Sequence, residues 1–145
     1  MCGVCVEDNN QKINLSLYYY IEQTVFNFQK YAKNVLKEEY LSDTEYIILM
    51  RIAYKKHVTQ KELADKYNLS EGYVAKMLRD FEDNGFVQRI ENSENRRQKI
   101  VSLTEKGIQY THYLQQITKD WEEEITLKLT DDELKQFKRI FNKLI

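Results

Sequence analysis

The sequence lacks proline and has only four glycines among its 145 residues, so little in it would interrupt long helices. No apolar run approaches the roughly 18 residues needed to cross a bilayer, and no secretory signal pattern opens the chain. We therefore expect a cytoplasmic protein. The two histidines, His57 and His112, lie in no metal-ligand or nucleophile pattern, and there is no glycine-rich phosphate loop. These absences argue against an enzyme and against a bound cofactor.

Excess positive charge is missing as well. Lysine and arginine number 22 against 23 aspartate and glutamate, so no overall positive field draws the protein to nucleic acid. The content of 42% hydrophobic and 31% charged residues is that of a globular protein. Because no repeat or linker divides the chain, we expect a single domain over residues 1–145.

Apolar residues recur every three to four positions through most of the chain, which is typical of helices buried on one side. The first stripe predicts a long helix from Ile13 to about Tyr40. The segments "SDTE", "TQKE" and "TDDE" have the form of capping boxes, and they predict helix starts at Ser42, Thr59 and Thr130. The expected inward residues are Tyr46, Ile47, Leu49, Met50 and Ala53 after Ser42, and Leu134, Phe137, Phe141 and Leu144 after Thr130.

The middle of the chain predicts two helices joined by a short turn. "QKELADKY" follows the cap at Thr59, "NLS" forms the turn, and "EGYVAKMLRDFEDN" runs to Gly85, a residue favoured just past a helix end. Asn68 can adopt the left-handed conformation that ends a helix, and Ser70 can cap the next one. This arrangement fits a helix-turn-helix motif, although an ordinary helical hairpin has the same pattern.

The two faces of the second helix differ in chemistry. At 3.6 residues per turn, Val74, Leu78 and Phe81 share one side, whereas Lys76 and Arg79 lie opposite, next to small and hydroxyl-bearing residues. Such a face suits the DNA major groove, because lysine and arginine can reach phosphates or guanine edges. The alternative is a solvent-facing surface, and residues 70–99 carry six charges of each sign.

Beyond Gly85, "FVQRI" and "QKIVSL" alternate and predict two paired strands. The polar segment "ENSENRR" between them places Arg96 and Arg97 at the tip of a hairpin, which is a wing next to the helix-turn-helix. Guanidinium groups at this tip could enter a minor groove or hold phosphates, or they could simply be solvated. Thr104 is expected to cap the following helix, where Gly107 leaves room for close packing.

The segments "LSDTEYIILMRI", "TQKELADKYNLSEGYVAKMLRDFEDNGFVQRI" and "NRRQKIVSLTEKG", over residues 41–107, resemble the MarR (multiple antibiotic resistance regulator) family. The resemblance implies a mainly α fold with a small β-hairpin wing (α+β). In it, a winged helix-turn-helix lobe of about 42–103 is flanked by dimerisation helices of about 11–40 and 104–145. Asn95 stands where the family's wing motif has an aspartate that supports the wing arginines, so this support would be weaker here.

The resemblance also implies a function, namely a sequence-specific transcriptional regulator that binds a pseudo-palindromic operator in double-stranded DNA as a homodimer. Such a regulator is usually a repressor that is released by a small anionic or phenolic effector or by thiol oxidation. The alternative is a winged-helix module for protein–protein contact that binds no DNA. The residues expected at DNA are Ser70, Gly72, Tyr73, Lys76, Arg79, Arg96 and Arg97.

The outer helices carry more apolar surface than a winged lobe of this size needs to cover. We therefore expect them to form a two-fold dimer, although they could instead fold back on their own chain. The expected dimer residues are Ile13, Leu17, Trp121, Phe137 and Phe141.

The only cysteines are Cys2 and Cys5, in "MCGVC". They could be incidental thiols in a tail. Two thiolates are too few for a structural zinc site, but four from two chains could hold zinc or an iron–sulfur cluster across a dimer. Each pair could also close as a disulfide.

Overall fold

The computed structural model describes residues 15–37, 41–93, 95 and 98–145. These residues form six helices and one small antiparallel sheet, which confirms the mainly helical winged fold. None of the described helices is both long enough and apolar enough to span a membrane. In chain order the elements are α1 (Leu17–Leu36), α2 (Asp43–Lys55), β1 (Val58–Thr59), α3 (Gln60–Tyr67), α4 (Glu71–Asp83), β2 (Val87–Glu91), β3 (Lys99–Leu103), α5 (Glu105–Thr126) and α6 (Asp131–Phe141).

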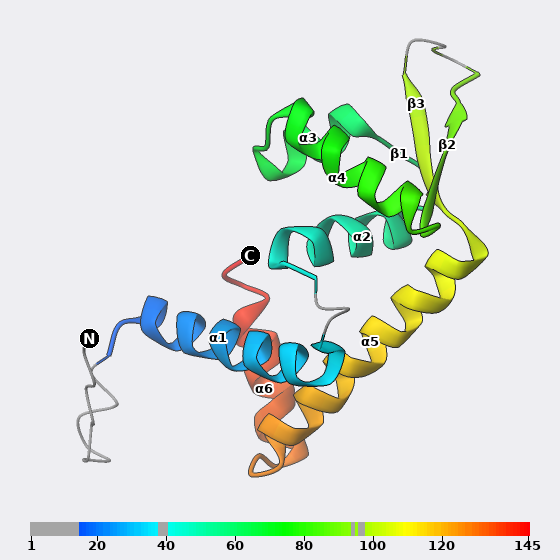
Figure 1. The fold of residues 1–145 in the computed structure, drawn as a ribbon. Coiled ribbons are helices and arrows are strands. Elements are labelled where there is room, and N and C mark those ends of the chain that lie inside the picture. Colours follow the sequence, from blue (N-terminus) through cyan, green and yellow to red (C-terminus); the bar gives the residue numbers. More distant parts are fainter. Residues whose placement is uncertain (1–14, 38–40, 94, 96–97) are drawn as a thin grey trace, which may run out of the picture.

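The elements divide into a winged lobe and a set of outer helices (Figure 1). The lobe contains α2, α3, α4 and the sheet. Helix α5 starts at the base of the wing and runs toward the opposite end of the molecule, where α1 and α6 lie. This arrangement joins the lobe to the outer helices mainly through one long helix.

Local hydrogen bonds start α2, α3, α4 and α6 where the sequence predicts. Full capping boxes form at Ser42, Thr59 and Thr130, each with the glutamate three residues later. Asn68 is left-handed at the end of α3, with φ 52°, and Ser70 caps α4 by accepting a hydrogen bond from the Tyr73 backbone. The predicted end of α3 at Asn68 and the predicted cap of α4 at Ser70 are therefore confirmed.

Four sequence-based expectations differ from the structure. Helix α1 begins at Leu17, capped by Ser16, rather than at Ile13. Helix α6 buries none of its residues in the single chain, and Phe137, expected to face inward, is 57% exposed.

Helix α1 ends at Leu36 rather than near Tyr40, because Lys37 adopts a positive φ of 51° and its N–H closes back onto the Lys33 carbonyl. In α2 the buried face is rotated by about one residue. Ile48 and Ile52 are fully buried, whereas Ile47, which the sequence pattern places inside, is 43% exposed.

The sheet has the strand order β1-β3-β2. Strands β2 and β3 pair antiparallel from Val87 opposite Leu103 to Glu91 opposite Lys99, as expected for a wing. The two-residue strand β1, which the sequence did not predict, pairs Val58 with Val101 on the other edge of β3. Through this pairing, the segment just before α3 is held against the wing.

One hydrophobic core runs from the helix-turn-helix and the sheet through α2 to α1 and α5. The predicted inner face of α4 is confirmed, since Val74, Leu78 and Phe81 are buried. They share one hydrophobic cluster with Leu63 of α3 and Val101 of β3. Burial of this face fixes which side of α4 is left for other contacts.

Gly107 lies at a very close approach between α5 and the start of the wing. A Cβ atom at this position would be 1.9 Å from the carbonyl oxygen of Phe86, a backbone atom that cannot easily move aside. By contrast, a Cβ on Gly72 of α4 would have no atom within 4 Å. The two helical glycines therefore serve different purposes.

We predict that Gly107→Ala lowers the free energy of unfolding by ~2 kcal/mol or more, because the new methyl group collides with backbone. Gly72→Ala should leave it unchanged or raise it by up to ~1 kcal/mol, since alanine favours a helix and the site is open. Urea unfolding followed by circular dichroism measures both variants. Equal stabilities would show that the Gly107 contact can relax.

Candidate nucleic-acid interface

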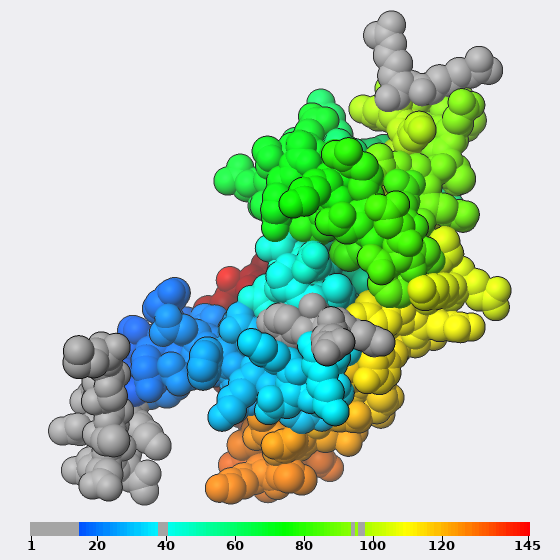
Figure 2. Space-filling view, viewed as in Figure 1, coloured from blue at the N-terminus to red at the C-terminus, as the bar shows by residue number. Residues whose placement is uncertain are grey.

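The outward face of α4 is open. Ser70, Gly72, Tyr73, Lys76 and Arg79, which the sequence predicts to contact DNA, are all exposed. In Figure 2 the green surface of α3 and α4 and the yellow-green wing stand clear of the blue helix α1. The structure therefore brings these five residues together on one accessible side of the winged lobe.

Arg79 does not extend straight away from α4. Its Nε donates a long hydrogen bond of 3.4 Å to the Ala75 carbonyl, one turn earlier in the same helix. Arg89 of β2 reaches the same carbonyl at 3.5 Å. The guanidinium of Arg79 thus lies on the side of α4 that faces the wing.

Of the loop that joins β2 and β3 in the sequence, the structure describes residues 92, 93, 95 and 98. Asn95 is exposed, and its backbone carbonyl accepts a hydrogen bond from the Gln98 N–H at 2.9 Å. Arg96 and Arg97 lie outside the described residues, so their predicted roles, and the predicted support of the wing by Asn95, stay predictions.

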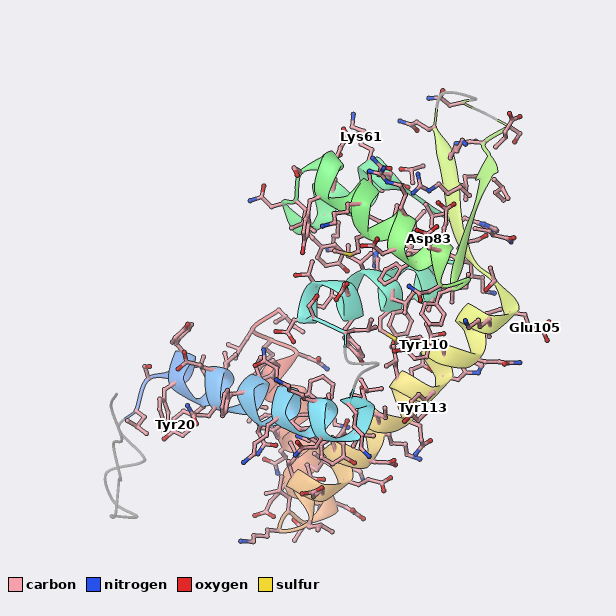
Figure 3. The ribbon with its side chains drawn as sticks, in the orientation of Figure 1. Tyr20, Lys61, Asp83, Glu105, Tyr110 and Tyr113 are labelled. Atoms are coloured by element: carbon pink, nitrogen blue, oxygen red, sulfur yellow. The ribbon has the colours of Figure 1, made fainter. Side chains whose placement is uncertain are left out.

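The structure adds basic and amide residues that sequence reasoning did not select. A hollow of about 290 Å³ between the start of α3 and the sheet is lined by Gln60, Lys61, Arg89 and Lys99, among others. Gln60 donates to the Glu71 carbonyl at 3.2 Å and so ties the start of α3 to the start of α4. Lys61 extends from α3 into solvent on the side of the wing tip (Figure 3). Only the pairing of β1 with β3 reveals that these residues are neighbours.

The capping box of α3 carries a perturbed carboxylate. The backbone N–H and the hydroxyl of Thr59 both donate to Glu62, at 2.7 and 2.9 Å. These hydrogen bonds hold the pKa of Glu62 below its ordinary value, with a smaller contribution from Lys55 and Arg51, while partial desolvation opposes them. The ionised cap therefore stabilises the start of the helix-turn-helix.

The residues predicted for dimerisation fall into two groups. Leu17 and Phe137 are more than half exposed, and Phe137 packs on Phe141 with ring centroids 5.7 Å apart. Trp121 instead contacts its own chain, where it donates to Asn27 at 2.7 Å and meets the edge of a phenylalanine ring in α1. Ile13, Cys2 and Cys5 lie outside the described residues.

A second hollow, of about 500 Å³, lies between α2, β3 and α5 on another side of the lobe. Its lining includes Tyr54, His57, Ser102, Ile108 and His112. Both histidines of the chain are thus at one groove, although they are far apart in the sequence.

The fold and this exposed helix define a winged helix-turn-helix protein, and comparison with known proteins gives its family. Residues 41–99 match the MarR family model. The chain is 30% identical over 102 residues to the HTH-type transcriptional regulator SarZ of Staphylococcus aureus. The matched region covers 70% of this chain and 68% of SarZ. It is 27% identical over 123 residues to the HTH-type transcriptional regulator BilQ of Clostridium symbiosum, covering 83% and 85% of the two chains.

Solved structures agree with this assignment. A crystal structure of MarR superposes with a TM-score of 0.79 at 26% identity and covers 90% of this chain and 89% of that chain. A mutant MarR from E. coli, complexed with operator DNA, shares the fold with a TM-score of 0.72 at 22% identity, covering 95% and 99%. The chain belongs to the MarR family. Its members are transcriptional regulators rather than enzymes, as the sequence indicated.

We predict that Glu62→Gln lowers the free energy of unfolding at pH 7 by up to ~1 kcal/mol, because the ionised cap is lost. Since the pKa of Glu62 is depressed in the folded state, its contribution is full above the unfolded value and disappears as the pH falls through the folded value. Urea unfolding should therefore show a larger difference between wild type and variant at pH 7 than at about pH 3.

Asp65→Asn is the control, because it removes an exposed carboxylate from the same helix outside the capping box. A Glu62 variant as stable as the wild type at neutral pH would contradict the role assigned to the cap.

Proposed function

We propose that the protein is a sequence-specific DNA-binding transcriptional repressor that acts as a homodimer on a pseudo-palindromic operator. The observation that carries this proposal is the outward face of α4. It combines an unobstructed glycine, Gly72, with the exposed side chains of Tyr73 and Lys76 on a helix whose opposite face is buried. A helix of this kind can approach the bases of a major groove closely.

The wing supports the same proposal. Strands β2 and β3, which the wing loop joins in the sequence, extend from the end of α4 to one edge of the lobe (Figure 1), where a bound duplex would continue past the recognition helix. Arg96 and Arg97 belong to this loop in the sequence. Lys61 and Lys99 add positive charge on the same side and suit contacts with phosphate. The operator complex of the E. coli protein supports DNA as the partner of this fold.

The exposed apolar surface of the outer helices supports a homodimer. Leu17, Val25 and Phe26 of α1 and Phe137 and Ile140 of α6 are all at least 46% exposed in the single chain. A monomer would leave these side chains in water, whereas a two-fold partner would bury them. Two recognition helices about 34 Å apart then read two half-sites one turn of DNA apart.

Release from DNA by a small anionic or phenolic effector belongs to the same proposal. The groove with Tyr54, His57 and His112 supports it, because its volume of about 500 Å³ suits a small aromatic ligand. It lies between α5, which leads to the outer helices, and β3 of the wing. Oxidation of Cys2 and Cys5 is the alternative trigger, and both residues lie outside the described part of the chain.

Selection of bound fragments from random DNA tests the proposal directly. A motif with two-fold symmetry would support both sequence-specific binding and a symmetric dimer. Failure to retain any DNA at low salt would favour the alternative, a winged-helix module that contacts proteins.

With the selected operator, we predict that Lys76→Ala weakens binding. If Lys76 contacts phosphate, all sequences should be affected alike and the salt slope should fall by about one unit; if it contacts a base, discrimination should fall instead. Lys119→Ala is the control, since it removes an exposed lysine from α5. Mobility shifts at several salt concentrations measure both variants, and unchanged affinity for Lys76→Ala would contradict the docking of α4 in DNA.

We predict that Phe137→Glu shifts the protein from dimer to monomer, because it introduces a charge into the apolar face of α6. Gln136→Glu, at the neighbouring exposed position, should leave the dimer intact. Sedimentation equilibrium gives the mass of each variant. A dimer unaffected by Phe137→Glu would place the subunit interface elsewhere.

A further inference from the structure

An ion pair connects the recognition helix α4 to the wing. Arg89, in the middle of β2, places its Nε 3.1 Å from a carboxylate oxygen of Glu82, in the last turn of α4. Both side chains are partly buried, at 21% and 32% exposure. The Arg89 Nε makes no hydrogen bond among the described residues, so its contact with Glu82 is electrostatic. A charge pair at this depth is screened less by salt than a surface pair. Removing one partner would leave the other charge partly buried and unpaired, which is costly.

Arg89 also contacts α4 at a second level. Its terminal nitrogen donates to the carbonyl of Ala75. Ala75 comes seven residues before Glu82, which places it about 10 Å closer to the N-terminal end of the helix axis. The Glu82 side chain can meet the same guanidinium because helical side chains lean toward the helix N-terminus. One guanidinium on the wing therefore fixes α4 at two points, which constrains both its position and its rotation.

Arg79 brings a second positive charge close to Arg89, which increases the need for the negative charge of Glu82. Its Nε lies 3.4 Å from the same Ala75 carbonyl, so two guanidinium groups gather at one backbone acceptor. The carboxylate of Glu82 offsets this local excess of positive charge. Without it, Arg79 and Arg89 would repel each other across the space between α4 and β2.

We infer that Arg89 and Glu82 are positioning residues that hold the recognition helix in a fixed register to the wing, and that operator affinity depends on this pair. The inference rests on the proposed function. It assigns to a carboxylate near the DNA interface a role in favour of DNA binding. Simple electrostatics assigns the opposite role, because a negative charge near phosphates should weaken binding.

The positioning role and simple repulsion from phosphate predict opposite effects on operator affinity when the charge of Glu82 is removed, so an experiment can separate them. Glu82→Gln and Asp83→Asn each remove one negative charge from the end of α4 with little change in shape. Asp83 is exposed, and the structure gives it no ion pair among the described residues (Figure 3). Asp83→Asn should leave operator affinity unchanged or slightly tighter. Glu82→Gln should weaken it about tenfold, which corresponds to ~1.4 kcal/mol, with an unchanged salt slope because no phosphate contact is lost.

A charge exchange separates pairing from other effects of either residue. Glu82→Arg and Arg89→Glu alone each place two like charges together and should weaken operator binding strongly. The double variant restores opposite charges and should bind more tightly than either single variant. Losses that simply add in the double variant, or a Glu82→Gln protein that binds as tightly as Asp83→Asn, would overturn the inference.

A measurement on the free protein keeps the inference distinguishable from the proposed function. Amide hydrogen exchange over Val87–Glu91 should be faster in Glu82→Gln than in Asp83→Asn, whereas exchange in the middle of α5 should be equal in both. Equal exchange over β2 would overturn the positioning role. A wild-type protein that binds no DNA would instead overturn the proposed function, whatever the exchange rates show.

Discussion

The close contact between Gly107 of α5 and the backbone of Phe86 determines how the two parts of the molecule meet. Around it, the Thr104 N–H donates to the Phe86 carbonyl at 3.0 Å, and Lys106 reaches the Asn84 carbonyl at 2.7 Å. The end of α4, the start of the wing and the start of α5 are thus in contact with one another. Because α5 leads directly to the outer helices, these contacts link the placement of the outer helices to that of α4 and the wing.

The features that the sequence predicted well depend on residues close to one another along the chain. The capping boxes at Ser42, Thr59 and Thr130 are hydrogen bonds between residues three apart, so the sequence contains all their partners. The division of α4 into a buried and an open face follows from helical geometry alone. For the same reason, the residue pattern by itself locates the exposed side of the helix that carries Gly72 and Lys76.

The features that it missed depend on distant partners. Strand β1 has only two residues, too few to show an alternating pattern. It forms because its backbone pairs with β3, which is distant in the sequence. The buried side of α2 is decided by where α5 and the sheet lie, so Ile48 replaces Ile47 in the core. Likewise, nothing in "FVQRI" shows that Arg89 faces α4, because its partner Glu82 is defined only by the angle between helix and wing.

Because the chain is nearly neutral, the proposed DNA binding would depend more on the exact placement of contacting residues than it does in a strongly basic DNA-binding protein. With 22 basic and 23 acidic residues, the protein has little general attraction to phosphate. Sequence-independent binding would therefore be weak. In the proposed function, affinity for an operator would rely on the simultaneous contacts of α4 and the wing in both subunits of the proposed homodimer. Simultaneous contact requires that these elements be held at a fixed spacing before they meet DNA. The acidic residues are thus compatible with the proposed interface, because a carboxylate such as Glu82 can contribute to rigidity.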